Sequence, residues 1–197
     1  MNVALYFGSF NPIHHGHLII ANEIMQQENY QELWFVISPQ NPFKNENNLL
    51  NANHRFHLLQ LAVEGEYKLK ASNIEFKLPK PSYTVNTLVY LKEKYPNHQF
   101  DIVLGSDGFQ NIIKWKNSAF IIENYKFLIY KRPGYDVNNE AMANIKIIEG
   151  PQLYISSTHI RKLIEEQKSI KYLVPDLVAG EIKARGYYNL SKKETKK

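Results

Sequence analysis

The stretch that decides the fold is Gly8-Ser9-Phe10-Asn11-Pro12-Ile13-His14-His15-Gly16-His17. It directly follows the apolar run at residues 2–7, whose length and composition predict a short buried strand. From Gly16 onward the apolar residues return at helical spacing, which predicts a helix. The chain therefore opens with a strand, a loop rich in glycine, proline and histidine, and a helix.

The same alternation of strand and helix continues along the chain. Further strands are predicted at residues 33–38, 74–77, 100–104, 126–130 and 145–148, and further helices at 54–64, 84–95, 157–167 and 175–185. Asn53 is the predicted N-cap of the first of these helices. This order favours an α/β fold with a doubly wound parallel sheet and a small C-terminal helical part.

The segments that directly follow strands are the expected place for functional residues. In doubly wound sheets, ligands bind beyond the carboxyl ends of the strands. The segments concerned are residues 8–10, 39–44, 105–107 and 131–132, which carry glycines, hydroxyls and charges.

Length and composition limit the class of protein. The 197 residues, 44% of them hydrophobic, suit one domain, predicted at residues 1–190, with a basic and disordered tail at 191–197. The last six residues hold four lysines and one glutamate, which supply +3 of the formal +5 charge, so no nucleic-acid partner is expected. The chain has no cysteine, no signal-peptide pattern and no run of about 18 apolar residues. These features predict a cytoplasmic protein without a membrane partner.

The first loop has the residue types of an anion-binding site. Gly8 permits a tight strand exit and a close approach of a ligand to the backbone. His14 and His17 are three residues apart, which places both rings on one side of the first helical turn. Gly16 leaves the helix start open, so that its N–H groups and positive end can face a phosphate. The alternatives are histidines that merely flank a helix start, or a zinc site, for which no third ligand stands at matching spacing.

A second candidate anion site is Ile155-Ser156-Ser157-Thr158-His159-Ile160-Arg161. A run of hydroxyl side chains before a helix is typical of ordinary N-capping. Arg161, one turn into the same helix, adds a planar guanidinium that can bind phosphate oxygens through two hydrogen bonds. Two such helix starts at one edge of a sheet predict a binding site for a triphosphate.

Two further segments make the pattern specific: Pro81-Ser82-Tyr83-Thr84, and Gly105-Ser106-Asp107 with Trp115 beyond it. Together with the two candidate anion sites, they make nearly the whole chain resemble the bacterial nicotinate-nucleotide adenylyltransferases of the HxGH nucleotidyltransferase superfamily. The resemblance implies a Rossmann-like nucleotidyltransferase fold and an enzyme that transfers AMP from ATP to nicotinate mononucleotide. The products would be deamido-NAD and pyrophosphate, in the biosynthesis of NAD.

The resemblance also implies roles for individual residues. The catalytic group comprises His14, His17, Lys44 and Arg161. The ATP-binding group comprises Gly8, Ser9, Phe10, His14, His17, Gly105, Asp107, Ser156, Ser157, Thr158 and Arg161. The group that binds nicotinate mononucleotide comprises Ser9, Phe10, Lys44, Thr84, Asp107 and Trp115. Mg²⁺ is expected to enter with ATP and to bridge phosphates and water, so no metal site built of protein ligands is expected.

Several of these residues also have a structural alternative. Lys44, the expected flexible cation above the phosphates, equally suits a solvated loop, and Trp115, expected to stack on the pyridine ring, equally suits a core or surface position. Asp107, the expected ribose ligand, and Thr84, expected beside the nicotinate, are also typical helix N-caps. Arg55 matches a position of the family, and a surface role fits it as well.

Three other functions stay open at this point: transfer to nicotinamide mononucleotide, transfer to phosphopantetheine, and nucleotide sensing without turnover. The segments at 81–84 and 105–107 argue against phosphopantetheine, and the intact candidate catalytic group argues against mere sensing. The chain is too short for a class I aminoacyl-tRNA synthetase core and lacks a Lys-Met-Ser-Lys-Ser loop. The choice between nicotinate and nicotinamide is left open, and so is the oligomeric state, with which a homo-oligomer is compatible.

Overall fold

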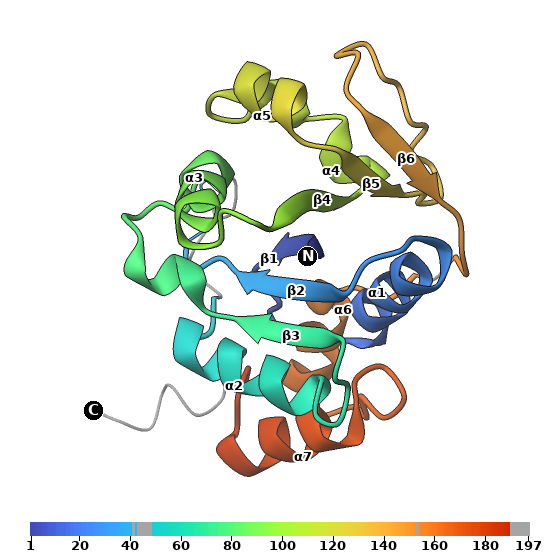
Figure 1. Ribbon diagram of the computed structural model, residues 1–197. Helices are drawn as coiled ribbons and strands as arrows, with labels where there is room; N and C mark the ends of the chain where they lie inside the picture. The colour runs from blue at the N-terminus through green and yellow to red at the C-terminus, as the bar shows by residue number, and fades with distance from the viewer. Residues whose placement is uncertain (41, 43–48, 153, 190–197) are drawn as a thin grey trace.

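One parallel sheet of six strands forms the centre of the computed structural model, which describes residues 1–40, 42, 49–152 and 154–189 (Figure 1). The strands are β1 (Asn2–Gly8), β2 (Glu32–Ile37), β3 (Leu69–Ser72), β4 (Gln99–Gly105), β5 (Phe127–Tyr130) and β6 (Ile145–Ile148). Their order across the sheet is β3-β2-β1-β4-β5-β6. The predicted tail at residues 191–197 lies outside the described residues.

The order of the strands is that of a doubly wound sheet. The chain starts in the centre with β1, moves outward through β2 to β3, and then continues on the other side of β1 with β4. Tyr6 of β1 pairs with Phe35 of β2 on one side and with Val103 of β4 on the other. The two halves of the sheet diverge at the carboxyl ends of β1 and β4, which is where such sheets bind ligands. The predicted fold class is confirmed.

Helices cover both faces of this sheet (Figure 1). Residues 3–6 of β1 point alternately into two cores, Ala4 and Tyr6 into one and Val3 and Leu5 into the other. A strand that is buried on both faces is apolar throughout, which explains the apolar run at residues 2–7. The first core is covered by α1 (His15–Gln27), α2 (Ala52–Ala62), α6 (Ser157–Glu165) and α7 (Asp176–Arg185), and the second by α3 (Thr84–Lys94), α4 (Ser106–Phe109) and α5 (Ser118–Asn124).

The two C-terminal helices α6 and α7 confirm the predicted helical part, and they pack on the same face as α1 and α2. None of the helices within the described ranges is long and apolar enough to cross a lipid bilayer.

The strand predicted at residues 74–77 is wrong. Ile74–Lys77 form a short 3-10 helix, η2, and the edge strand is β3, which pairs with β2 from Leu33↔Leu69 onward. Four residues that alternate between apolar and polar fit either structure when they are taken alone. The helical turn places Glu75 in the interior, where it accepts a hydrogen bond from Thr87 Oγ1 at 2.8 Å.

Some helix boundaries and short helices also differ from the sequence-based expectation. Asn51 caps α2 in place of the predicted Asn53, because its side chain accepts the Asn53 N–H at 2.9 Å. The helices α4, η3 (Ile112–Lys114) and α5 are absent from the predicted elements. They are three to seven residues long, too short for a helical period to emerge from the sequence.

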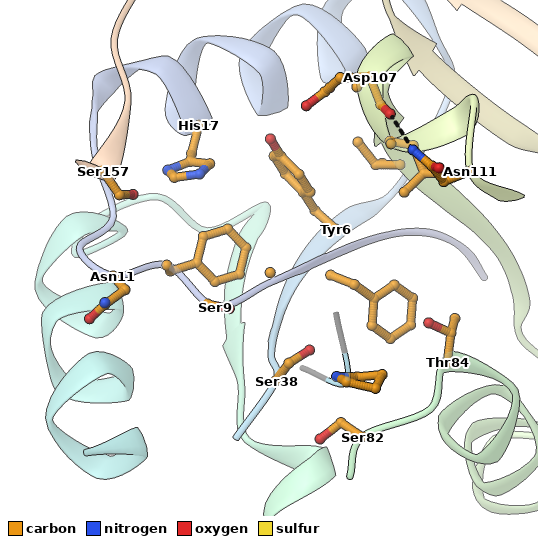
Figure 2. Close-up of a pocket in the computed structure, with 18 of the residues that line it drawn as sticks. Tyr6, Ser9, Asn11, His17, Ser38, Ser82, Thr84, Asp107, Asn111 and Ser157 are labelled. Carbon is orange, nitrogen blue, oxygen red and sulfur yellow. Dashed lines mark hydrogen bonds between the residues drawn. The ribbon is translucent and has the colours of Figure 1, made fainter. Parts of the chain in front are cut away.

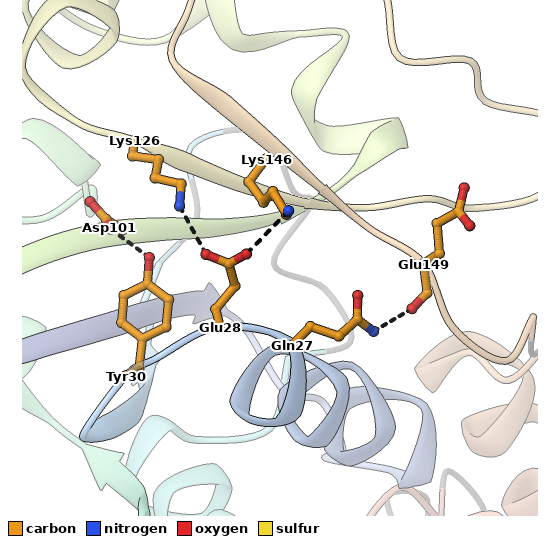
Figure 3. A network of polar contacts seen from close by, with 7 residues as sticks. All are labelled: Gln27, Glu28, Tyr30, Asp101, Lys126, Lys146 and Glu149. Atoms are coloured by element: carbon orange, nitrogen blue, oxygen red, sulfur yellow. Dashed lines mark hydrogen bonds and ion pairs between the residues drawn. The ribbon is translucent and has the colours of Figure 1, made fainter.

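The amino edge of the sheet carries a network of paired charges (Figure 3). Glu28, directly after α1, forms ion pairs with Lys126 at 3.0 Å and with Lys146 of β6 at 3.5 Å. Tyr30, just before β2, donates a hydrogen bond to the carboxylate of Asp101 in β4. These contacts fasten the connection between α1 and β2 to the strands of the other half of the sheet.

Candidate active site

A cavity of about 760 Å³ lies at the carboxyl edge of the sheet. Figure 2 shows His17 and Ser157 on one side of it, Ser82 and Thr84 on the other, and Ser9 between the two sides. Every predicted site residue within the described ranges lines this cavity: Gly8, Ser9, Phe10, His14, His17, Thr84, Gly105, Asp107, Trp115, Ser156, Ser157, Thr158 and Arg161. Lys44 lies outside the described residues.

Gly8 and Phe10 shape the floor of the cavity. The backbone of Phe10 has a φ of +44°, and its ring folds back over the end of β1. A Cβ on Gly8 would stand 2.8 Å from that ring, so only glycine fits beneath it. The Phe10 ring is 2% exposed and packs edge-on against Tyr6 and His17. Its observed contacts are therefore those of a packing residue that supports His17.

His14 and His17 meet at the start of α1, as their spacing predicted. Their rings are stacked, with centroids 3.7 Å apart and planes inclined by 25°. A Cβ on Gly16 would lie 3.0 Å from the His14 ring, so this glycine gives the ring its place against the helix. One N–H of the helix start is already used, because His15 N–H donates to Leu173 O at 2.9 Å. A second is used within the turn, because His17 N–H donates to His14 O at 2.9 Å. The two imidazoles are therefore the main candidate anion-binding groups of this helix start.

Burial keeps His14 uncharged. The side chain is 3% exposed, and desolvation lowers the pKa of His14 from 6.5 to about 3, helped by the positive charges of Arg132 and His15. Its Nδ1 atom is buried and has no hydrogen-bond partner among the described residues. A neutral imidazole carries one N–H donor and one acceptor nitrogen, so His14 can donate a hydrogen bond to a phosphate without bearing a charge.

Arg55 of α2 lies beneath the loop after β1 and is fully buried, so the surface role considered for it is wrong. Its guanidinium donates to the backbone oxygens of Ser9, of Ser38 at 3.0 Å and of Pro39 at 3.1 Å, and its Nε to that of Leu50 at 2.7 Å. Burial lowers the pKa of Arg55 to about 10, which leaves the group charged at neutral pH. The guanidinium thus holds the loops after β1 and β2 side by side under the cavity.

The Ser9 hydroxyl above it is a group without a partner. Ser9 is 5% exposed, and its Oγ atom is buried with no hydrogen-bond partner in the described part of the chain. Buried polar atoms are rarely left in this state unless a ligand or water satisfies them. The predicted contact of Ser9 with substrate is consistent with this position.

The start of α6 is bound directly to the loop after β1. Ser157 Oγ donates to Pro12 O at 2.9 Å, and the Arg161 guanidinium donates to Asn11 O at 2.8 Å. Ser156 acts as the N-cap, because its Oγ accepts the His159 N–H at 3.2 Å. The two predicted anion sites are therefore parts of one continuous surface. The Ser157 hydroxyl and one side of the Arg161 guanidinium connect the start of α6 to the loop after β1.

Asp107 lies in the first turn of α4, and Gly105 occupies the cap position, so the N-cap alternative for Asp107 is wrong. Its carboxylate pairs with Arg132 at 3.2 Å, and Arg132 N–H donates to Ser106 Oγ at 3.0 Å. A Cβ on Gly105 would collide with the Asp107 carboxylate, so this glycine leaves room for the pair. Arg132 was not among the predicted site residues, although its place directly after a strand was a signal for it.

The far side of the cavity is formed by the start of α3. Tyr83 occupies the position before this helix, and no side chain caps the helix at this described start, so the N-cap alternative for Thr84 is wrong. Ser82 N–H donates to Gln40 O at 2.9 Å, which ties this loop to the loop after β2. Thr84 is thereby placed on the cavity wall opposite His17 (Figure 2).

Trp115 and Lys116 complete this side. Trp115 is half-buried and lines the cavity. It is therefore neither a core residue nor a fully exposed surface residue, the two alternatives considered for it. The ammonium of Lys116 lies 4.4 Å from the centre of the Tyr83 ring, within the range of a cation–π contact. Neither Lys116 nor Tyr83 was among the predicted site residues.

The charges of the described lining are mainly positive. Lys114, Lys116, Arg132 and Arg161 line the cavity together with a single carboxylate, that of Asp107. A cavity with this excess of positive charge attracts and retains phosphorylated ligands.

Comparison with known proteins agrees with this geometry. Residues 5–163 match the cytidylyltransferase-like family. A Cytophaga hutchinsonii protein named "Probable nicotinate-nucleotide adenylyltransferase" is 44% identical over 192 residues, which cover 96% of this chain and 99% of the relative. A Christiangramia forsetii protein of the same name is 45% identical over 190 residues, or 94% of this chain and 97% of the relative.

Solved structures show the same fold. Plasmodium falciparum nicotinic acid mononucleotide adenylyltransferase complexed with NaAD has a TM-score of 0.81 over 95% of this chain and 97% of its own, at 24% identity. The same enzyme complexed with APC has a TM-score of 0.80 at 23% identity, over 95% of this chain and 96% of its own. By the family match and the near-complete coverage of its relatives, the chain belongs to the nicotinate-nucleotide adenylyltransferase family of cytidylyltransferase-like proteins.

Proposed function

We propose that this protein is an enzyme that transfers the adenylyl group of ATP to nicotinate mononucleotide. The observation that carries the proposal is the joined surface of the stacked His14 and His17 with the start of α6. The relatives that bear this activity in their names align with almost the whole chain. The products are deamido-NAD and pyrophosphate, and the reaction is a step in the biosynthesis of NAD.

The reaction requires little covalent chemistry from the side chains of the protein. An oxygen of the acceptor's phosphate attacks the α-phosphorus of ATP, a bond between the two phosphates forms, and the bond to pyrophosphate breaks. The attacking oxygen is already an anion at neutral pH, so no general base is required. Hydrogen-bond donors and cations at fixed positions are then the main requirement, and the described lining of the cavity supplies both.

The histidines would stabilise the charge that develops on the α-phosphate. Because the pKa of His14 is lowered to about 3, His14 acts as a neutral donor, and His17 is stacked beside it. Arg161 donates two of its five N–H groups to Asn11 O and Thr158 Oγ1, so the others can hold the leaving pyrophosphate. Lys44 is assigned to the same task by family resemblance.

The acceptor would lie on the opposite side of the cavity. Trp115 offers a flat apolar surface for the pyridine ring, and Thr84 lies on the same side. Asp107 also lines the cavity, where its carboxylate, paired with Arg132, can accept a hydrogen bond from a ribose hydroxyl. In this proposed pose, the acceptor's phosphate would face the histidines.

A Mg²⁺ ion that enters with ATP would take its ligands mainly from phosphate oxygens and water. Within the described ranges, no group of three or more histidines and carboxylates could hold a metal ion, and the Asp107 carboxylate is paired with Arg132. Mg²⁺ accepts phosphate oxygens and water as ligands, so it needs no cage of protein side chains. When bound in this way, it would supply neutralisation of charge on the triphosphate.

The test is pyrophosphate release from ATP with each of three acceptors: nicotinate mononucleotide, nicotinamide mononucleotide and phosphopantetheine. We expect the highest kcat/KM with nicotinate mononucleotide. A preference for either of the other acceptors would show a different adenylyltransferase. ATP binding without turnover of any acceptor would show a nucleotide-binding module and overturn the proposal.

A further inference from the structure

The acceptor side of the cavity has a cation of its own, Lys116. Its ammonium lies 4.4 Å from the centre of the Tyr83 ring, and both residues line the cavity. Within the described part of the chain, no carboxylate forms an ion pair with Lys116. The aromatic ring holds the ammonium at the wall of the cavity without neutralising its charge.

The other cations of the described lining have different partners. Arg132 pairs with Asp107 at 3.2 Å, and Arg161 donates to Asn11 O on the histidine side. Lys114, two residues before Lys116, donates to Asn111 Oδ1 at 2.9 Å. Lys116 is therefore a positive charge on the acceptor side whose one described contact is an aromatic face.

The backbone around Lys116 is held in a compact turn. Trp115 N–H donates to Ile112 O at 3.0 Å, and Ser118 N–H donates to Trp115 O at 3.1 Å. Asn117, with a left-handed φ of +52°, then directs the chain into α5. The turn places Trp115 and Lys116 together on the acceptor side, next to the Tyr83 ring at the start of α3.

We infer that Lys116 is a specificity-determining residue that selects a pyridine carboxylate over a pyridine carboxamide. The inference rests on the proposed function, in which the acceptor's phosphate faces the histidines and its ring lies on the side of Trp115. The ring then carries its substituent into the region of the Lys116 ammonium. A nicotinate carboxylate gains a charge-assisted contact there, and a neutral nicotinamide does not. Tyr83 is a positioning residue that keeps the ammonium at the wall.

The experiment compares kcat/KM for nicotinate mononucleotide and for nicotinamide mononucleotide in the full chain and three variants. In Lys116→Met we expect kcat/KM for the nicotinate substrate to fall about fivefold, mainly through KM, because the lost contact is partly solvated. The value for the nicotinamide substrate should stay within about twofold of the parent, since a neutral group makes no ion pair. Lys116→Arg keeps the charge and should keep most of the selectivity.

Lys114→Met is the matched control, because it removes the same charge two residues away. It should leave the ratio of the two kcat/KM values unchanged. Higher ionic strength should narrow the selectivity of the parent protein and leave that of Lys116→Met nearly constant.

Two results overturn the inference. The first is an unchanged ratio of the two kcat/KM values in Lys116→Met. The second is an equal fall of this ratio in Lys114→Met, which would show that the positive potential of the cavity as a whole, and not Lys116 in particular, selects the carboxylate. In both cases the parent protein still prefers nicotinate mononucleotide. A parent protein that uses neither pyridine nucleotide would instead overturn the proposed function, and the inference with it.

Discussion

The two edges of the sheet use most of their polar side chains differently, although His98 Nδ1, at the amino edge, is also buried without a partner among the described residues. At the amino edge, Glu28 is paired with Lys126 and Lys146. At the carboxyl edge, Ser9 Oγ and His14 Nδ1 are buried without a partner among the described residues. Leaving a buried polar atom unsatisfied costs about 1–3 kcal/mol. The carboxyl edge therefore gives up stability for groups that a ligand can satisfy, while the amino edge uses its polar groups to hold the fold together.

The largest effect that this comparison predicts is on catalysis. His17→Ala should lower kcat roughly 100- to 1000-fold, because it removes a donor to the charge that develops on the α-phosphate. The free energy of unfolding should change little. Steady-state kinetics and urea denaturation measure the two quantities, and His15→Ala, on the neighbouring position outside the cavity, is the control that should keep most of the activity. An unchanged kcat in His17→Ala would remove His17 from the mechanism.

Arg55 is an exception at the carboxyl edge, because its side chain stabilises the fold through hydrogen bonds to backbone oxygens. Arg55→Met should lower the free energy of unfolding by about 3 kcal/mol, because it leaves the carbonyl oxygens that Arg55 binds unsatisfied in the interior. Arg55→Lys should recover little of this loss, since one ammonium cannot reproduce the planar fork of a guanidinium. Denaturation curves of the two variants check the prediction. A variant as stable as the parent would show that these oxygens find other partners.

The buried state of His14 makes stability depend on pH. The pKa of His14 is about 3 in the folded chain and 6.5 in its ordinary state, so below pH 6.5 the unfolded chain binds a proton that the folded chain does not. The free energy of unfolding should therefore fall as pH drops, by about 1.4 kcal/mol between pH 7.5 and 5.5, and stay nearly constant above that range. His14→Gln should lack this contribution, so the difference between the two curves measures it. Parallel curves would mean that His14 titrates normally in the folded chain.

The smallest effect belongs to the amino edge. Glu28→Gln should lower the free energy of unfolding by about 1 kcal/mol, because two lysines lose their shared carboxylate, and kcat/KM should not change. Glu166→Gln, which removes an exposed ion pair with Lys168, is the control and should have no measurable effect on stability. A loss of activity in Glu28→Gln would show that the amino edge contributes to catalysis as well as to stability.

Most of the fold could be predicted from the sequence because it depends on local patterns. Strands that are buried on both faces are apolar runs, as β1, β2, β4 and β5 are, and the edge strand β6 was also predicted, from three isoleucines in four residues. The exception is β3, Leu69-Lys70-Ala71-Ser72, a short edge strand with a charge in its middle, whose pairing with β2 is visible only in space. The neighbouring residues 74–77 have a more strand-like pattern, but they form a 3-10 turn in which Glu75 accepts a hydrogen bond from Thr87.

The candidate site likewise contains residues that local sequence patterns indicate and residues that only the folded structure brings together. The glycines, histidines and hydroxyls of the two helix starts are contiguous in sequence, so their spacing indicated their chemistry. Arg55, Arg132 and Lys116 come from three different segments of the chain, and each has at least one partner 16 or more residues away. Arg132 had a local signal, its place directly after a strand, and Arg55 matched a family position. No local pattern in the sequence distinguishes Lys116 from a lysine on the surface.

The hydrogen bonds from Ser157 to Pro12 and from Arg161 to Asn11 join residues that are 145 and 150 positions apart in the chain. During synthesis on the ribosome, the first loop is therefore exposed long before the helix that completes it has been made. Contacts with so large a sequence separation carry a high entropy cost of loop closure and slow folding. A nascent or truncated chain that ends before residue 156 would contain both histidines but none of the residues of α6 that bind the first loop. We therefore expect such a chain to lack adenylyltransferase activity.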